Sequence, residues 1–218
     1  MVWQDTLRTV LEYVYDPLEK DGVGWAVCGS TATALQGCRL TPHGLNLLAQ
    51  EPPGVYRFAE LLRPFAAPDS PEVRQGMGDV VLSTPSVPVQ IWHEWGALWH
   101  GARFVIDRTD ASGVGIAHIA PPQVHEFNDR GIVWENGPAL WRHLRRVAFA
   151  SYSVPVVPLE FQVGTNLDRG RTKHGEDCMG RVREIARVFR ENGYDCALLE
   201  WALDAAHLAR FDEIMRTQ

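Results

Sequence analysis

The stretch WAVCGSTATALQG, residues Trp25–Gly37, decides the fold; the chain continues from it through TPHGLNLL, residues Thr41–Leu48. The apolar residues before Gly29 predict a short buried strand. The small residues that follow Ser30 predict a helix ending near Gly37. The apolar residues after Gly44 predict a second strand, so the stretch predicts a strand, a turn, a helix and a strand in succession.

The Gly29-Ser30 turn has two interpretations. A strand that ends in Gly-Ser leaves backbone N–H groups free, and the next helix directs the positive end of its dipole toward them. Such a turn favours an anion. Alternatively, Ser30 simply caps the helix through its hydroxyl, as serine commonly does.

This stretch resembles the nucleotidyltransferase fold family, in the branch that places Gly-Gly or Gly-Ser at a helix start and Pro-His-Asp-apolar-Asp on the next strand. Here the second element is Pro42-His43-Gly44-Leu45-Asn46, so Gly44 and Asn46 stand where the family has two acids. The third acid of the family lies on a later strand, and Val87–Trp92 offers Gln90 as its counterpart. All three positions are neutral.

The resemblance implies an α/β (α+β) fold with a mixed β-sheet flanked by helices. It also implies transfer of a nucleoside monophosphate from a nucleoside triphosphate to an acceptor hydroxyl, with two Mg²⁺ ions held by the three acids. Hard cations require anionic oxygen ligands, and Gly44, Asn46 and Gln90 supply none. We therefore expect a degenerate site without catalytic residues or metal ligands, because each lost charge removes a large share of the transition-state stabilisation.

Nucleotide binding does not require those acids, because backbone N–H groups and basic side chains also hold phosphates. The resemblance extends weakly to the proline-containing segment Val154–Phe161 and the basic residues after it. Arg39 and Thr41 have an equally good structural explanation, and His43 is better explained as a turn residue than as an acid–base group. The predicted nucleotide-binding residues are Gly29, Ser30, Arg39, Thr41, Asn46, Arg169, Arg171 and Lys173.

Length and composition predict one domain with an appendage. The 218 residues are 45% hydrophobic, enough for a sizeable core. We expect a nucleotidyltransferase-like core over residues 1–150 and a helical C-terminal region over 151–218. No apolar run reaches the roughly 20 residues that span a membrane, and the N-terminus lacks a signal peptide, so we expect a cytoplasmic protein. The four cysteines form no Cys-x-x-Cys pair, which favours reduced thiols over a zinc or redox site.

Charge is unevenly distributed along the chain. The net charge of −6 argues against a general nucleic-acid binder. Residues 1–138 carry 9 Lys and Arg against 16 Asp and Glu, whereas residues 139–190 carry 10 against 5. The basic part could face phosphates, although arginines on exposed helix faces explain it equally well.

Hydrophobic periodicity places the other elements. It predicts helices over 3–15, ended by Asp16-Pro17, and over 56–65 and 138–150. From Pro158 onward the pattern is helical, with apolar residues from Met179 to Phe189 at helical spacing and Gly193 as the stop, and one or two helices follow over 197–215. Strands are predicted over 79–82, 87–91, 103–106 and 131–135, with a loop over 107–115. The core is thus a sheet covered by helices.

The segment Trp92–His100 holds three of the eight tryptophans. His93 and His100 are seven residues apart and could share a helix face, but no third metal ligand is identifiable, so packing aromatics beside surface histidines is the better explanation. An exposed tryptophan cluster could instead stack a base or bind a protein partner.

Three hypotheses follow from these patterns. The first is a nucleotidyltransferase-like pseudoenzyme that binds a nucleoside triphosphate or has a regulatory role. The second is an active transferase that holds Mg²⁺ with recruited acids such as Glu51, Asp79 or Glu94. The third is a partner-binding protein that uses the Trp92–Trp99 cluster and binds no nucleotide.

Overall fold

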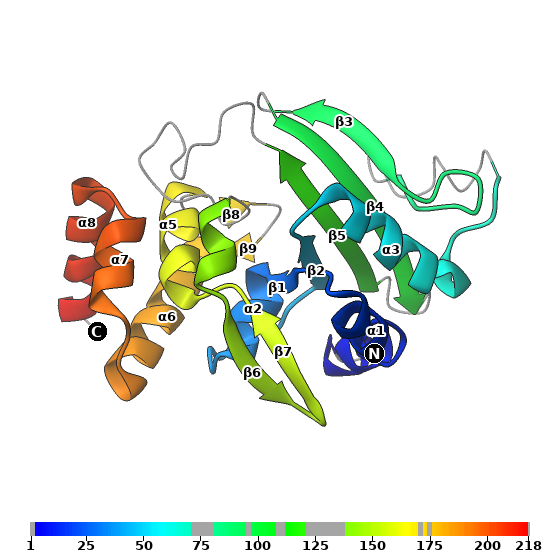
Figure 1. The fold of residues 1–218 in the computed structure, drawn as a ribbon. Helices are drawn as coiled ribbons and strands as arrows, with labels where there is room; N and C mark the ends of the chain where they lie inside the picture. Colours follow the sequence, from blue (N-terminus) through cyan, green and yellow to red (C-terminus); the bar gives the residue numbers. More distant parts are fainter. Residues whose placement is uncertain are drawn as a thin grey trace.

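The chain folds around a seven-stranded mixed sheet of order β3-β4-β5-β2-β1-β7-β6 (Figure 1). The computed structural model describes residues 3–70, 81–94, 97–107, 112–120, 138–169, 172–173 and 176–217. The strands of the sheet are β1 (Trp25–Cys28), β2 (Gly44–Ala49), β3 (Gln90–Glu94), β4 (Ala97–Asp107), β5 (Ser112–Ala120), β6 (Arg145–Phe149) and β7 (Tyr152–Val156).

Helices follow or flank most of these strands, and two short strands form a separate ribbon. The helices are α1 (Trp3–Asp21), α2 (Gly29–Leu35), α3 (Pro52–Leu61), α5 (Leu159–Arg169), α6 (Cys178–Asn192), α7 (Cys196–Ala202) and α8 (Ala205–Thr217). The 3-10 turns are η1 (Arg63–Phe65) and η2 (Pro138–Arg142), and the ribbon pairs β8 (Thr172–Lys173) with β9 (Glu176–Asp177).

The pairing pattern confirms the predicted mixed sheet. β1 is antiparallel to β2, and β2 is parallel to β5. β4 is antiparallel to both β3 and β5. On the other side, β7 is parallel to β1 and forms a hairpin with β6, so residues on both sides of position 150 belong to the sheet.

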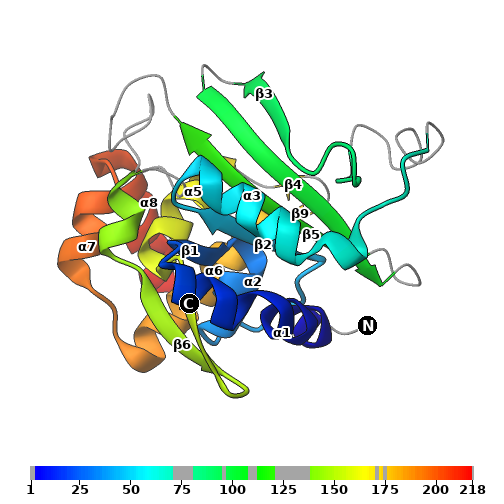
Figure 2. The same ribbon diagram turned by 45° about the vertical axis from the view of Figure 1, so that its right-hand side comes forward.

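One face of the sheet carries the main hydrophobic core. Helices α1 and α3 lie against this face (Figure 2). Their apolar stripes meet every second residue of the strands, as strand alternation requires. The buried residues include Leu7, Val10, Leu11 and Val14 of α1, Val55 and Phe58 of α3, and Val27, Leu45, Leu47, Phe104, Val114 and Ile116 of the sheet.

The C-terminal helices form two further clusters beyond β1 and β7. α5, α6 and α8 pack around Val163, Ile185 and Phe211. α5, α7 and η2 pack against Cys28 and Leu48, which lie on the sheet face opposite α1. The helical character predicted for this region is confirmed, including the stop of α6 at Gly193, whose φ of 77° suits glycine.

Two predicted helices have different bounds or structures. α1 does not end at Asp16-Pro17 but continues to Asp21. The last turn buries Leu18 completely, which outweighs the hydrogen bond that Pro17 cannot donate.

The predicted helix over 138–150 is wrong, because the chain forms η2 and then β6. Burial along β6 alternates residue by residue, and the strand pairs with β7 through a turn in which Ala150 has a φ of 51°. Long-range pairing therefore overrides the helical spacing of Leu140, Leu144 and Val147.

The remaining segments differ in smaller ways. The predicted loop over 107–115 is shorter, because β5 begins at Ser112. The chain around Ser83 is not a strand, although its backbone bonds to Arg103 in β4. The strand predicted over 131–135 lies outside the described residues.

No helix in the described part of the chain is long and apolar enough to cross a membrane. All four cysteines are free thiols; Cys28, Cys38 and Cys178 are buried and Cys196 is exposed.

Candidate functional site

The turn between β1 and α2 is the first component of the site. Gly29 has a φ of 62°, which glycine adopts at little cost, and this allows α2 to begin directly after the strand. Cys28 is therefore the N-cap, and no side chain caps the helix. This corrects the capping interpretation of Ser30, which lies inside α2. Its hydroxyl has no hydrogen-bond partner among the residues that the structure describes.

Two threonines of α2 make hydrogen bonds beside this turn, one to the start of β2 and one within the helix. Thr31 Oγ1 donates to the carbonyl oxygen of Gly44 over 2.9 Å. Thr33 Oγ1 donates to the carbonyl oxygen of Gly29, also over 2.9 Å. The Thr31 bond thus places the start of α2 beside Gly44.

A row of residues crosses the sheet next to this turn. Cys28 in β1 pairs with Asn46 in β2, Asn46 pairs with Gly115 in β5, and Gly115 pairs with Arg103 in β4. Directly paired residues project from the same face of a sheet. We call Asn46, Gly115 and Arg103 the cross-strand row; it lies on the face opposite α1 and α3.

The side chains of the row approach one another over Gly115. A Cβ at Gly115 would lie 3.4 Å from Asn46 Oδ1 and 4.0 Å from Arg103 Nε. A Cβ at Gly29 would lie 3.5 Å from Asn46 Nδ2. The Asn46 amide therefore spans the space between the β1–α2 turn and the guanidinium group, and any larger residue at 115 would fill that space.

Arg103 is the only charged member of the row. Its backbone N–H donates to Ser83 Oγ over 2.9 Å, and its carbonyl accepts from the Ser83 N–H over 2.8 Å. Its guanidinium has no ion pair or hydrogen bond with any described residue. The side chain of Arg103 is exposed, but desolvation by neighbouring atoms lowers its pKa. An arginine still remains charged at neutral pH.

This donor set does not suit a divalent cation. Asn46 offers one neutral amide oxygen, Gly44 and Gly115 offer no side chain, and Arg103 adds a positive charge that repels a metal ion. Within the described ranges, no three His, Cys, Asp or Glu side chains are grouped so that they could hold a metal. The residues present do not fit the two Mg²⁺ ions that the resemblance implies.

Gln90 lies away from the row. It pairs with Gly101 on the edge strand β3, and β4 and β5 separate it from β2. Its side-chain amide is 3.5 Å from the carbonyl oxygen of Leu82. The sheet neighbour of Asn46 on the later strand is Gly115, so the assignment of Gln90 to the third position is corrected by the strand order.

Among the predicted basic residues that the structure describes, Arg39 lies away from the β1–α2 turn. Arg39 follows the C-terminal end of α2, whereas Gly29 is at its N-terminal end. Thr41 and His43 are exposed in the segment that leads to β2. Arg169 is the last residue of α5, Arg171 lies outside the described residues, and so does the side chain of Lys173 in β8.

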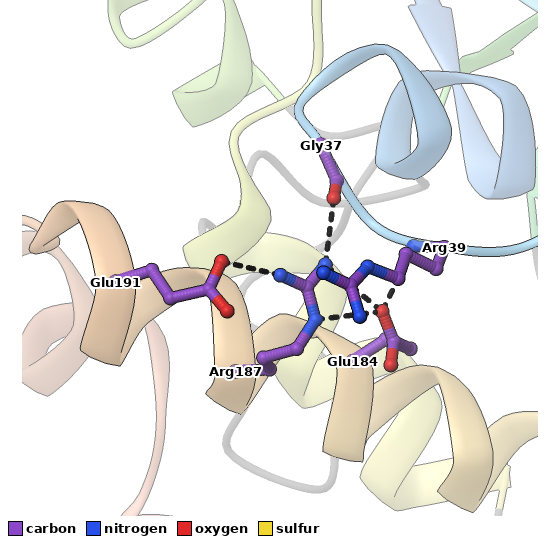
Figure 3. Close-up of polar contacts among 5 residues, drawn as sticks. All are labelled: Gly37, Arg39, Glu184, Arg187 and Glu191. Carbon is purple, nitrogen blue, oxygen red and sulfur yellow. Dashed lines mark hydrogen bonds and ion pairs between the residues drawn. The ribbon is translucent and has the colours of Figure 1, made fainter.

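Arg39 instead belongs to a polar clamp between the α2–β2 segment and α6 (Figure 3). Its backbone N–H donates to Glu184 Oε2 over 2.8 Å, and Arg187 Nη2 donates to the carbonyl oxygen of Gly37 over 2.8 Å. Arg187 also bonds to Glu184 and Glu191. The clamp fixes the segment that carries Thr41 and His43 toward β2, which is a structural role.

The Glu184 carboxylate is the centre of this clamp. Desolvation alone would raise its pKa, but the hydrogen bonds from the Arg39 backbone and the Arg187 guanidinium outweigh that effect and lower the pKa below its usual value. The carboxylate is therefore held in its charged form in the folded protein.

Of the recruited acids of the second hypothesis, Glu51 is described in full and is not at the row. Glu51 precedes α3, beyond the end of β2 that is farther from Gly44. Glu94 ends the edge strand β3, and its side chain lies outside the description, as does the whole of Asp79.

The tryptophan-rich segment is a hairpin rather than a helix. Trp92 in β3 pairs with Trp99 in β4, and their rings stack with centroids 5.7 Å apart. Trp92 also covers Gly101, because a Cβ there would lie 2.7 Å from its ring. His93 and His100 are on different strands of this hairpin, so the shared helix face is wrong.

Sequence reasoning missed Arg103 and Gly115. Arg103 alternates with the buried residues Ala102 and Phe104, so its place on an exposed strand face was readable from the pattern. The proximity of Arg103 to Asn46 could not be predicted from the sequence, because it depends on the register of β2, β5 and β4.

Comparison with known proteins supports the fold. No protein-family model matches the sequence, and no curated protein matches it. Among solved structures, the chain is similar to a Thermotoga maritima protein provisionally assigned as a nucleotidyltransferase. The similarity has a TM-score of 0.52 and 23% sequence identity, and it covers 78% of this chain and 88% of the other. The architecture is therefore nucleotidyltransferase-like.

Proposed function

We propose that this chain is a nucleotidyltransferase-like protein that lacks metal-dependent nucleotidyl transfer and acts as a nucleotide-binding or regulatory module. The observation that carries the proposal is the cross-strand row. On a nucleotidyltransferase-like sheet, β2 presents Gly44 and Asn46 where the resemblance expects acids, and Arg103 lies across Gly115 from Asn46. Two-metal chemistry needs negative charge at this place, and the row supplies positive charge.

The β1–α2 turn supports retained nucleotide binding. Gly29 opens the turn, and the Ser30 hydroxyl makes no internal hydrogen bond in the parts of the chain that the structure describes. The first backbone N–H groups of α2 point out of the helix, as they do at every helix start. Such groups hold phosphate through hydrogen bonds and do not need a metal.

Calorimetric titration tests the proposal. The purified protein is titrated with ATP, GTP, CTP and UTP, each with Mg²⁺ and with excess EDTA. We expect at least one nucleotide to bind in EDTA. In parallel, the protein is incubated with radiolabelled nucleotides, Mg²⁺ and RNA, protein or small hydroxyl acceptors, and we expect no transfer. Robust transfer would instead favour an active enzyme with recruited acids such as Asp79 or Glu94, which amide substitutions would then identify.

A partner-binding role is the second candidate. The large exposed hydrophobic residues Val81, Val87, Ile91 and Trp92 lie on or just before the edge strand β3. Edge strands with exposed apolar residues are common sites of protein association. This role predicts a stable complex that no nucleotide affects and that Ile91→Lys weakens, together with no nucleotide binding by calorimetry.

A further inference from the structure

Glycines keep part of the sheet face around the cross-strand row free of side chains. Gly44, Gly113 and Gly115 are on neighbouring positions of β2 and β5. A Cβ at Gly113 would meet no heavy atom within 4 Å in the described structure. Two polar groups without a hydrogen-bond partner among the described residues lie next to these glycines, the Asn46 amide and the Arg103 guanidinium.

The orientation of Asn46 matches the charge of Arg103. Its Oδ1 is on the Gly115 side, toward Arg103 Nε, and its Nδ2 is on the Gly29 side. A neutral amide leaves the positive charge of Arg103 available, whereas a carboxylate at the same position would pair with it. The residue at position 46 thus decides whether the row is positive or neutral.

An unpaired guanidinium in partly desolvated surroundings is a strong site for an oxyanion. Its planar fork can donate two parallel hydrogen bonds to a phosphate, and reduced solvation strengthens the attraction. Arg103 has no partner among the described residues, and its exposed side chain lies beside Gly115 on the same sheet face as the Asn46 amide.

We propose that Arg103 supplies the positive charge of a metal-independent phosphate site, with the Asn46 amide beside it as a second contact. The inference rests on the proposed function only in assuming that the bound phosphate is part of a nucleotide. It goes further in naming the cation that takes the place of Mg²⁺ and in naming the ligand class, a di- or triphosphate that is free of metal.

The experiment is calorimetric titration in excess EDTA with inorganic triphosphate and with ATP as probes. Wild type, Arg103→Gln, Arg103→Lys and Asn46→Asp are compared. The matched control is Arg63→Gln, an exposed arginine of η1 whose side chain has no hydrogen bond or ion pair in the described chain. Circular dichroism checks that each variant is folded.

We expect Arg103→Gln to weaken triphosphate binding roughly ten-fold or more, the usual scale for a charge-assisted hydrogen bond, and Arg63→Gln to change it less than two-fold. Arg103→Lys should fall between them, because it keeps the charge but loses the fork. Asn46→Asp should weaken binding as strongly as Arg103→Gln. Should Arg103→Gln be unfolded, Arg103→Lys and Asn46→Asp decide the outcome.

The two proposals fail in different ways. If wild type binds ATP in EDTA and the three site variants bind equally well, the role of Arg103 is overturned and the proposed function stands. If wild type binds triphosphate through Arg103 but no nucleotide, the phosphate site stands and the proposed function falls. Absence of both binding signals overturns both.

Discussion

The two faces of the β2–β5–β4 sheet differ sharply, although alternate residues of the same strands form them. On one face, Leu45, Val114 and Phe104 are buried beneath α1 and α3. On the other, Gly113 leaves open space, and Arg103 carries a charge that has no partner among the described residues. Strand alternation lets one face supply stability while the other carries chemistry that contributes little to packing. Substitutions on the two faces should therefore have separable effects.

The largest expected effect is on the packed face. Phe58 in α3 is fully buried and meets Trp25 edge to face with ring centroids 6.2 Å apart. Phe58→Ala should lower the free energy of unfolding by about 3–5 kcal/mol, because it leaves a cavity in the core. Urea denaturation measures the loss. Tyr56→Ala, two residues earlier and 45% exposed, is the control and should change it by less than about 0.5 kcal/mol.

Gly101 and Gly113 lie on the sheet face opposite α1 and α3, and alanine at each position tests how much space this open face leaves. Gly101→Ala would place a Cβ 2.7 Å from the Trp92 ring, so it should cost about 1–3 kcal/mol and shift the tryptophan fluorescence. Gly113→Ala meets no heavy atom in the described structure and should cost less than about 0.5 kcal/mol. Equal losses from the two variants would mean that the face is packed throughout.

The polar clamp tests how the open face is held in place. Glu184→Gln removes a charge that accepts hydrogen bonds from Arg39 and Arg187, and should cost about 1–2 kcal/mol at pH 7. The folded-state pKa of Glu184 is lowered, so its stabilisation is present above the unfolded pKa of about 4.3 and is lost as pH falls through the folded value.

Urea titrations of the wild type and Glu184→Gln between pH 7 and pH 3 measure this difference, which should shrink below about pH 4. Glu191→Gln is the control. It removes another partner of Arg187 that has no bond to the α2–β2 segment, and should cost less than about 0.5 kcal/mol. A pH-independent difference for Glu184→Gln would show that the charge of the clamp is unimportant.

The smallest stability effect should come from the cross-strand row itself. Arg103→Leu removes an unpaired guanidinium but keeps both backbone bonds to Ser83, so the free energy of unfolding should change by less than about 0.5 kcal/mol. A loss above 1 kcal/mol in urea denaturation would show that Arg103 is structural, and would erase the contrast between the two faces.

Local signals were enough to predict the centre of the fold. The β1–α2–β2 unit was readable because Gly29, Gly37 and Pro42 mark its boundaries and its contacts are close in sequence. The terminal helices were readable from their apolar spacing. The same spacing over 138–150 misled, because β6 is determined by its pairing with β7.

The candidate site was only partly predictable. Gly29, Ser30, Gly44 and Asn46 were found because they belong to the local unit. Gln90 was placed there on its apolar neighbours alone, whereas the strand order puts β4 and β5 between it and β2. Only the sheet register identifies the true neighbours of Asn46, and register depends on pairings between distant segments.

The clamp on α6 also has a consequence for the order of folding. It joins residues 145 and 150 positions apart in the sequence, through Arg39 to Glu184 and Gly37 to Arg187. During synthesis, β1, α2 and β2 leave the ribosome long before α6 exists, so the segment between α2 and β2 must wait for its last hydrogen bonds. The phosphate site we propose would thus become rigid only when the chain is nearly complete. A nascent chain that stops before Glu184 would contain the residues of the site but not the hydrogen bonds of the clamp.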